Sequence, residues 1–250
     1  MTARLDNALY RNAAWFFLAF LACTVWAFWP SYFARLFEQP SARFHAHGVA
    51  LTLWCSMLVV QPQLLRTGRR ACHRTLGKAS YVLAPALVVV TASFVHFRIG
   101  GGGPVEGLAV LPGSVLRSFA LMLGSLISFA VLYSLAIWHR REARAHARYM
   151  VSTVFPLFTP VTDRLIAAHA PWLAAVLPRI DGAPMLSVAG FVLADSILIG
   201  LAAWDWRTSH RKEFLVALGV LGVYHAATLT SYRVPLWNAF CVWFLSLPLS

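Results

Sequence analysis

Residues 45–65, HAHGVALTLWCSMLVVQPQLL, contain no Asp, Glu, Lys or Arg. A bilayer hydrocarbon core about 30 Å thick requires roughly 20 apolar residues in an α-helix, and this run has that length. Comparable runs occupy 13–33, 77–97, 115–138, 148–168, 184–204 and 213–232, and a shorter run occupies 235–249. The sequence therefore predicts an all-α fold, an integral membrane helical bundle of seven or eight transmembrane helices. We see no internal repeat and expect residues 1–250 to form a single transmembrane domain.

The composition supports a membrane protein rather than a soluble or nucleic-acid-binding one. Hydrophobic residues make up 59% of the chain and charged residues only 12%, whereas soluble domains average about a quarter charged residues. The net charge is +12, but the basic residues form short groups between the apolar runs. This pattern is typical of loops beside a membrane. We therefore expect membrane lipids as partners, and no nucleic acid.

The basic residues also predict an orientation. Fourteen of the 21 lie in four segments, 4–11, 66–78, 140–148 and 207–212, which the predicted helices place on one side of the membrane. The other seven fall on the opposite side. Because basic loops stay in the cytoplasm, the N-terminus is predicted to be cytoplasmic.

Several short motifs resemble those of a known family. They are HGVALTLWCSMLVVQ at 47–61, HRTLGK at 73–78, HARYM at 146–150, DWRTSHR at 205–211 and RVPLW at 233–237, together with Arg164. In order and spacing they resemble a family of small multi-pass bacterial membrane proteins of unknown function with His-Arg-x-x-Gly and His-x-Arg-x-Met motifs. The resemblance covers about residues 45 to 240. It implies a helical bundle in a bacterial inner membrane, and it implies no reaction.

A group of polar residues is predicted at the cytoplasmic edge. Because basic residues attract anionic lipids and disfavour a metal cation, we expect lipid or anion contact here. A phosphate, nucleotide or haem-propionate site and a metal site remain alternatives. The residues are Arg69, Arg70, His73, Arg74, His146 and Arg148.

A second group lies toward the periplasmic edge, at broadly similar depth on four predicted helices: His47, His96, His225 and Asp163. Imidazole and carboxylate groups bind transition metals, and two facing histidines can ligate haem. We predict a metal ion or haem b here. His45 and His47 point in nearly opposite directions on a helix, so only one of them can face the bundle. His47 lies deeper and begins the stretch that resembles the family, so it is the better candidate, with His45 at the interface. The alternative is a structural role, with histidines reaching interfacial water and Asp163 paired with its neighbour Arg164 or with another helix.

Two further ionisable residues, Asp195 and Arg164, are predicted to be intramembrane charges, which often mark functional sites. Asp195 is expected either to be protonated or to pair with a basic residue or histidine on another helix.

Three hypotheses for function follow. The leading one is a bacterial inner-membrane protein that binds a metal or haem near the periplasmic side for redox chemistry or electron transfer. The second is a non-catalytic subunit or assembly factor within a larger membrane complex or homo-oligomer. The third is a small proton-linked transporter that uses Asp195, His225 and Arg164.

Overall fold

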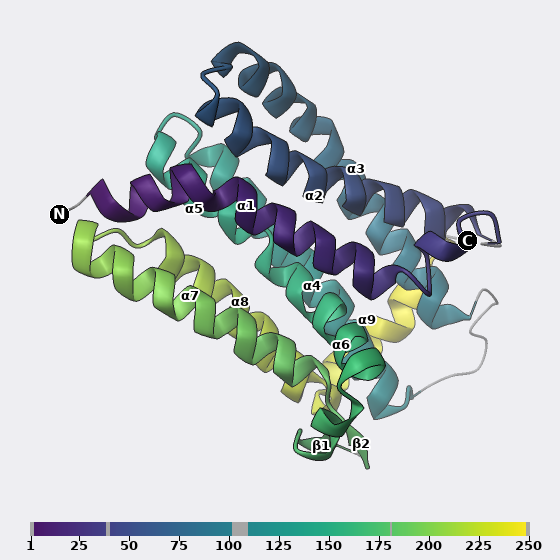
Figure 1. The fold of residues 1–250 in the computed structure, drawn as a ribbon. Helices are drawn as coiled ribbons and strands as arrows, with labels where there is room; N and C mark the ends of the chain where they lie inside the picture. The colour runs from purple at the N-terminus through teal and green to yellow at the C-terminus, as the bar shows by residue number, and fades with distance from the viewer. Residues whose placement is uncertain (1–2, 39–40, 102–109, 181, 249–250) are drawn as a thin grey trace.

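The computed structural model describes residues 3–38, 41–101, 110–180 and 182–248, and this part of the chain forms an all-α bundle (Figure 1). The α-helices are α1 (Ala3–Phe28), α2 (Ala42–Arg66), α3 (Arg70–Gly100), α4 (Gly113–Trp138), α5 (Ala143–Ser152), α6 (Phe158–His169), α7 (Ser187–Ser209), α8 (Glu213–Thr230) and α9 (Pro235–Ser246). Short 3-10 helices are η1 (Phe33–Arg35), η2 (Phe155–Leu157), η3 (Pro171–Ala175) and η4 (Ser231–Arg233). Two two-residue strands, β1 (Arg179–Ile180) and β2 (Ala183–Pro184), pair antiparallel between α6 and α7.

The two ends of the bundle differ in charge. The start of α1 and the α2–α3, α4–α5 and α7–α8 connections all lie at the left end in Figure 1. These connections and the residues beside them carry the four basic segments, so we call this the basic end. The α1–α2, α6–α7 and α8–α9 connections lie at the opposite end. The predicted grouping of loops is confirmed, whereas the side of the membrane that the basic end faces stays a prediction.

Six helices are long and apolar enough to cross a membrane. These segments are Arg11–Phe28, Ala42–Arg66, Arg70–Gly100, Gly113–Trp138, Ser187–Ser209 and Glu213–Arg233. The helical bundle is thus confirmed, but continuous helices in the described residues do not reach the expected seven or eight. The run at 235–249 gives α9, a helix of 12 residues. At 1.5 Å per residue α9 is about 18 Å long, which is shorter than a hydrocarbon core.

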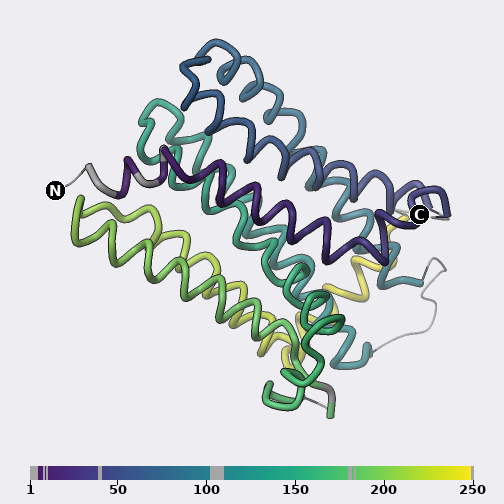
Figure 2. The backbone as a smooth tube through the Cα atoms, in the orientation of Figure 1, coloured from purple at the N-terminus to yellow at the C-terminus, as the bar shows by residue number. Residues whose placement is uncertain are grey.

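The predicted helix over 148–168 is broken. Helix α5 ends at Ser152, a 3-10 turn follows at Phe155–Leu157, and α6 begins at Phe158. Pro156 lies in this turn and cannot donate the backbone hydrogen bond that would continue the α-helix. The chain nevertheless continues from the basic end, through α5, to the opposite end at α6 (Figure 2).

Helix α4 lies in the middle of the bundle and supplies much of the core (Figure 1). Trp54 of α2 is fully buried, and its ring meets Phe129 of α4 edge-on at 4.9 Å. Helix α6 packs closely on α7 because Gly190 has no side chain. A Cβ atom there would lie 2.8 Å from the Cα atom of Thr159. This close approach fixes α6, and with it the residues that α6 contributes to the cavity described below.

A buried ion cluster joins three helices at the basic end. The Nε and Nη2 atoms of Arg148 on α5 donate to the two carboxylate oxygens of Asp205 on α7, at 2.6 and 2.7 Å. Nη2 also lies 2.8 Å from Asp6 of α1. The side chains of Arg148 and Asp205 are 1% and 0% exposed. The prediction that Arg148 contacts lipid was therefore wrong, because two carboxylates distant in sequence enclose its charge.

Candidate ligand-binding site

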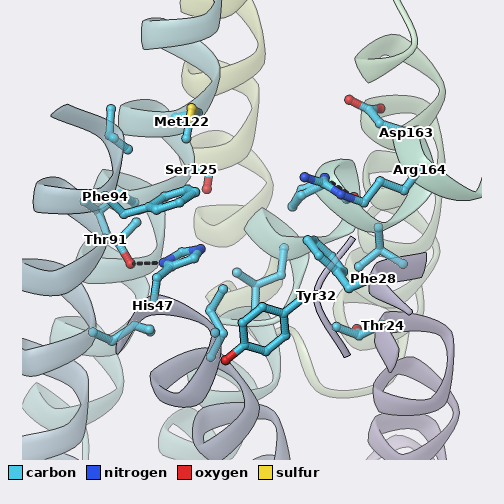
Figure 3. Close-up of a pocket in the computed structure, with 18 of the residues that line it drawn as sticks. Thr24, Phe28, Tyr32, His47, Thr91, Phe94, Met122, Ser125, Asp163 and Arg164 are labelled. Atoms are coloured by element: carbon cyan, nitrogen blue, oxygen red, sulfur yellow. Dashed lines mark hydrogen bonds between the residues drawn. The ribbon is translucent and has the colours of Figure 1, made fainter. Parts of the chain in front are cut away.

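A cavity of about 480 Å³ lies among α1, α2, α3, α4 and α6. Ligand pockets commonly measure about 300–1,000 Å³, so this cavity has the size of a small-molecule site. Its wall is largely aromatic and apolar, with a set of polar side chains between these surfaces (Figure 3). The aromatic wall includes Phe20, Phe28, Phe33, Phe44, Phe94 and Phe129.

His47, near the start of α2, lines this cavity. Its Nδ1 atom lies 3.1 Å from the Oγ1 atom of Thr91 on α3, and its ring stacks on Phe94 at 4.4 Å. A hydrogen bond and a stacked ring together hold the imidazole in one orientation (Figure 3). His45 is not a lining residue, and its ring lies 6.0 Å from that of Tyr32. Of the two histidines, His47 is the one that reaches the cavity.

Tyr32, between η1 and α1, is the second polar residue of the wall. Its side chain is buried, and its hydroxyl has no hydrogen-bond partner in the part of the chain that the structure describes. Burial raises the pKa of this phenol. The ring lies so close to α2 that a Cβ atom at Gly48 would come within 2.4 Å of its Cζ atom. Gly48 is therefore needed for this position of the ring.

Helix α6 supplies two charged residues, Asp163 and Arg164. The Arg164 guanidinium lies 4.1 Å from the centre of the Phe28 ring, and its Nη1 atom donates to the Pro160 carbonyl at 2.9 Å. Figure 3 shows Arg164 and His47 on opposite sides of the cavity. Within the described residues, the Oδ1 atom of Asp163 is buried without a partner, and no ion pair joins it to Arg164. The expected pairing of these two neighbours is thus absent.

The four predicted metal ligands lie in three separate places. His47 and Asp163 line the cavity. The Nε2 atom of His96 instead lies 3.1 Å from the carbonyl of Leu245, in the last turn of α9. His225 faces α7. Among the residues described, no three His, Cys, Asp or Glu side chains are grouped as a metal site. Equal depth along the bundle was the basis of the prediction, and depth does not fix the direction in which a side chain points.

Asp195 and His225 form a pair between α7 and α8. The Nδ1 atom of His225 lies 2.9 Å from Oδ2 of Asp195, and the imidazole stacks on Phe191 at 4.0 Å. The Oδ1 atom of Asp195 is buried and has no partner among the described residues. Of the two alternatives for Asp195, the structure shows pairing with a histidine.

At the basic end, the predicted lipid-contact residues separate into two kinds. Arg69, Arg70 and Arg74 are exposed. The two histidines instead face backbone carbonyls: Nδ1 of His73 lies 3.3 Å from that of Gln61, and Nδ1 of His146 lies 2.8 Å from that of Ala136. The three arginines remain candidates for lipid contact, whereas the histidines hold neighbouring helix ends.

Sequence reasoning missed Tyr32, Gly48 and Arg98, all of which line the cavity. Tyr32 lies in the aromatic stretch at 26–33, which is typical of a membrane interface, and no motif there pointed to a ligand. Comparison of the chain with protein families, curated proteins and solved structures finds no match. The family resemblance of the motifs accordingly stays a prediction.

Proposed function

We propose that this multi-pass membrane protein binds a small organic molecule, apolar over most of its length and polar at one end, in the cavity. The observation that carries the proposal is the combination of an aromatic wall with two buried polar atoms that have no hydrogen-bond partner among the described residues, the Tyr32 hydroxyl and Asp163 Oδ1. A buried polar atom without a hydrogen bond costs about 1–3 kcal/mol. Both atoms are covered by their neighbours, so a bound polar group would pair with them after a side chain of the wall moves, and the pairing would remove that cost.

His47 is the residue expected to matter most for binding, because its ring is held in place by Thr91 and Phe94 at the cavity wall. The test is organic extraction of protein purified in mild detergent, followed by mass spectrometry of the extract. His47→Ala should strongly reduce the amount of a co-purifying molecule, and His45→Ala should leave it near the wild-type level. Equal amounts in the two variants would contradict a binding role for His47.

A metal or haem b remains a proposal with less support. His47 and Asp163 both line the cavity, on opposite sides of it, but His96 and His225 lie elsewhere. Metal analysis and a visible absorption spectrum of the same preparation distinguish it from an organic ligand. One metal per chain, or a haem spectrum that His47→Ala abolishes, would favour the metal or haem proposal.

The proposed topology has seven crossings, with the N-terminus in the cytoplasm of a bacterial cell. Helix α4 finishes at the basic end. Helix α7 also finishes at the basic end, so it begins at the opposite end. The chain between them therefore has to cross, and α5, η2 and α6 provide a broken crossing. Single cysteines at Gly101 and Thr208, in a background without native cysteines, should react with impermeant thiol reagent from opposite sides. Labelling of both from one side would contradict this topology.

A second candidate function is proton-linked transport. It is favoured by the Asp195–His225 pair, which lies well inside α7 and α8, since paired ionisable residues within a membrane often carry protons. Interrupted helices are also common in transporters, and α5–η2–α6 is one. Proton flux into proteoliposomes under an imposed pH gradient should fall in Asp195→Asn and persist in the matched control Ser196→Ala. Unchanged flux in Asp195→Asn would remove this candidate.

A further inference from the structure

We infer that the polar end of the molecule bound in the cavity is an anion, carried by a single apolar chain. The inference rests on the proposed function and adds the chemical class of the ligand. The shared chemistry is a carboxylate or a phosphate at the end of a hydrocarbon chain. Its basis is the balance of charge around the cavity.

The charges that line the cavity do not cancel. In the described part of the chain the charged lining residues are Arg98, Arg164 and Asp163. Arg98 and Arg164 are both exposed and interact electrostatically with each other. Two guanidinium groups and one carboxylate give these lining residues a formal charge of +1. One negative charge on a ligand would complete the balance.

The arginines also have hydrogen-bonding capacity to spare. Arg164 uses one N–H in its bond to the Pro160 carbonyl, whereas a guanidinium has five N–H donors. Neither Arg98 nor Arg164 forms an ion pair within 4.0 Å among the described residues. The planar guanidinium matches the geometry of carboxylate and phosphate oxygens. With the Tyr32 hydroxyl, the polar wall therefore offers an excess of donors to an acceptor-rich head group.

Position and packing define where the head and the chain would lie. The Arg164 guanidinium is held against the Phe28 ring at one side of the cavity, and further phenylalanine and aliphatic side chains line other parts of the wall. The head group would lie at Arg164 and the chain along the aromatic surface. A volume of about 480 Å³ is toward the lower end of the range for small-molecule pockets, which favours one chain over two.

The test uses three probes of equal chain length, oleate, oleyl phosphate and oleyl alcohol. Binding of each is measured to the full chain in nanodiscs of zwitterionic lipid. We expect oleate or oleyl phosphate to bind at least 10-fold more tightly than oleyl alcohol. The preferred acid then distinguishes a carboxylate from a phosphate ligand. Arg164→Gln should weaken binding of the acid roughly 10- to 100-fold, because a hydrogen bond between charged groups is lost.

Two comparisons make this experiment decisive. The matched control is Arg35→Gln, at the same end of the bundle, where the arginine is exposed and outside the cavity; its affinity for the acid should equal that of wild type. One result would overturn the anionic head group and retain the proposed function. In it, the acid and the alcohol bind with equal affinity, Arg164→Gln leaves this affinity unchanged, and His47→Ala reduces it. Binding that is insensitive to both Arg164→Gln and His47→Ala would overturn both the anionic head group and the proposed function, and so would the absence of binding for all probes together with the absence of any co-purifying molecule.

Discussion

Removing the charge of Arg148 should strongly destabilise the protein. The side chain is 1% exposed and makes two short hydrogen bonds to Asp205, which is itself fully buried. In Arg148→Met the Asp205 carboxylate stays in the interior, and among the described residues the Ser209 hydroxyl is the one side-chain donor left to it. Loss of one partner from a buried ion pair costs about 3–5 kcal/mol. For a chain of this size, 1 kcal/mol corresponds to about 2–4 °C in the unfolding midpoint.

The expected fall in the unfolding midpoint of Arg148→Met is therefore about 6–20 °C, measured by thermal unfolding in a fixed detergent. The matched control is Arg141→Met, an exposed arginine in the preceding loop, whose effect should stay within about 0.5 kcal/mol. The double variant Arg148→Met/Asp205→Leu should recover much of the loss, since apolar groups can replace a buried ion pair. The reasoning would be refuted if Arg148→Met unfolded at the same temperature as the control.

Three further predictions concern other parts of the molecule. Gly48→Ala should displace the Tyr32 ring, because the new Cβ atom would lie 2.4 Å from Cζ. We expect the free energy of unfolding to fall by about 1–3 kcal/mol and less ligand to co-purify. An unchanged unfolding temperature together with an unchanged amount of extracted ligand would contradict this prediction. The hydrogen bond from Arg211 lowers the pKa of the Glu142 carboxyl. The ionised carboxylate therefore stabilises the folded protein fully above the ordinary carboxyl pKa, and this stabilisation is lost as the pH falls through the lowered pKa. At neutral pH Glu142→Gln should then unfold at a lower temperature than wild type, and this difference in temperature should vanish in strong acid. Neutral replacements at the exposed arginines of the basic end, Arg69, Arg70 and Arg74, should weaken binding to anionic vesicles. They should not change the amount of ligand that co-purifies with the protein.

The helices were predictable because a long apolar segment inside a membrane has few ways to satisfy its backbone hydrogen bonds. Every backbone N–H and C=O group in the hydrocarbon must be bonded within the protein, so the run at 45–65 forms α2, Ala42–Arg66. The break after Ser152 was not predictable from proline alone. Pro62 lies inside the continuous helix α2, whereas Pro156 lies in a 3-10 turn. The residues packed around each proline decide between these outcomes, and they come from other helices.

The candidate site was only partly predictable, for a related reason. The sequence shows how deep a histidine lies along its helix, and this was sufficient to select His47 over His45. It does not show how each helix is rotated against its neighbours. His96 therefore turned out to face the last turn of α9, and His225 to face Asp195. The Tyr32 contribution depends on a close approach between a connection and α2 at Gly48, which no local pattern encodes.

The buried ion cluster also bears on the order in which the chain is assembled during synthesis. Asp205 follows Arg148 by 57 residues, which a ribosome adds in roughly 3 to 10 s. Asp6 has been made long before and lies 2.8 Å from Arg148 in the finished structure. The first helix thus carries the carboxylate that can neutralise the arginine while α7 is still unmade. Asp205 is the last of the three residues to be made, and in the finished structure its carboxylate completes the enclosure of the guanidinium.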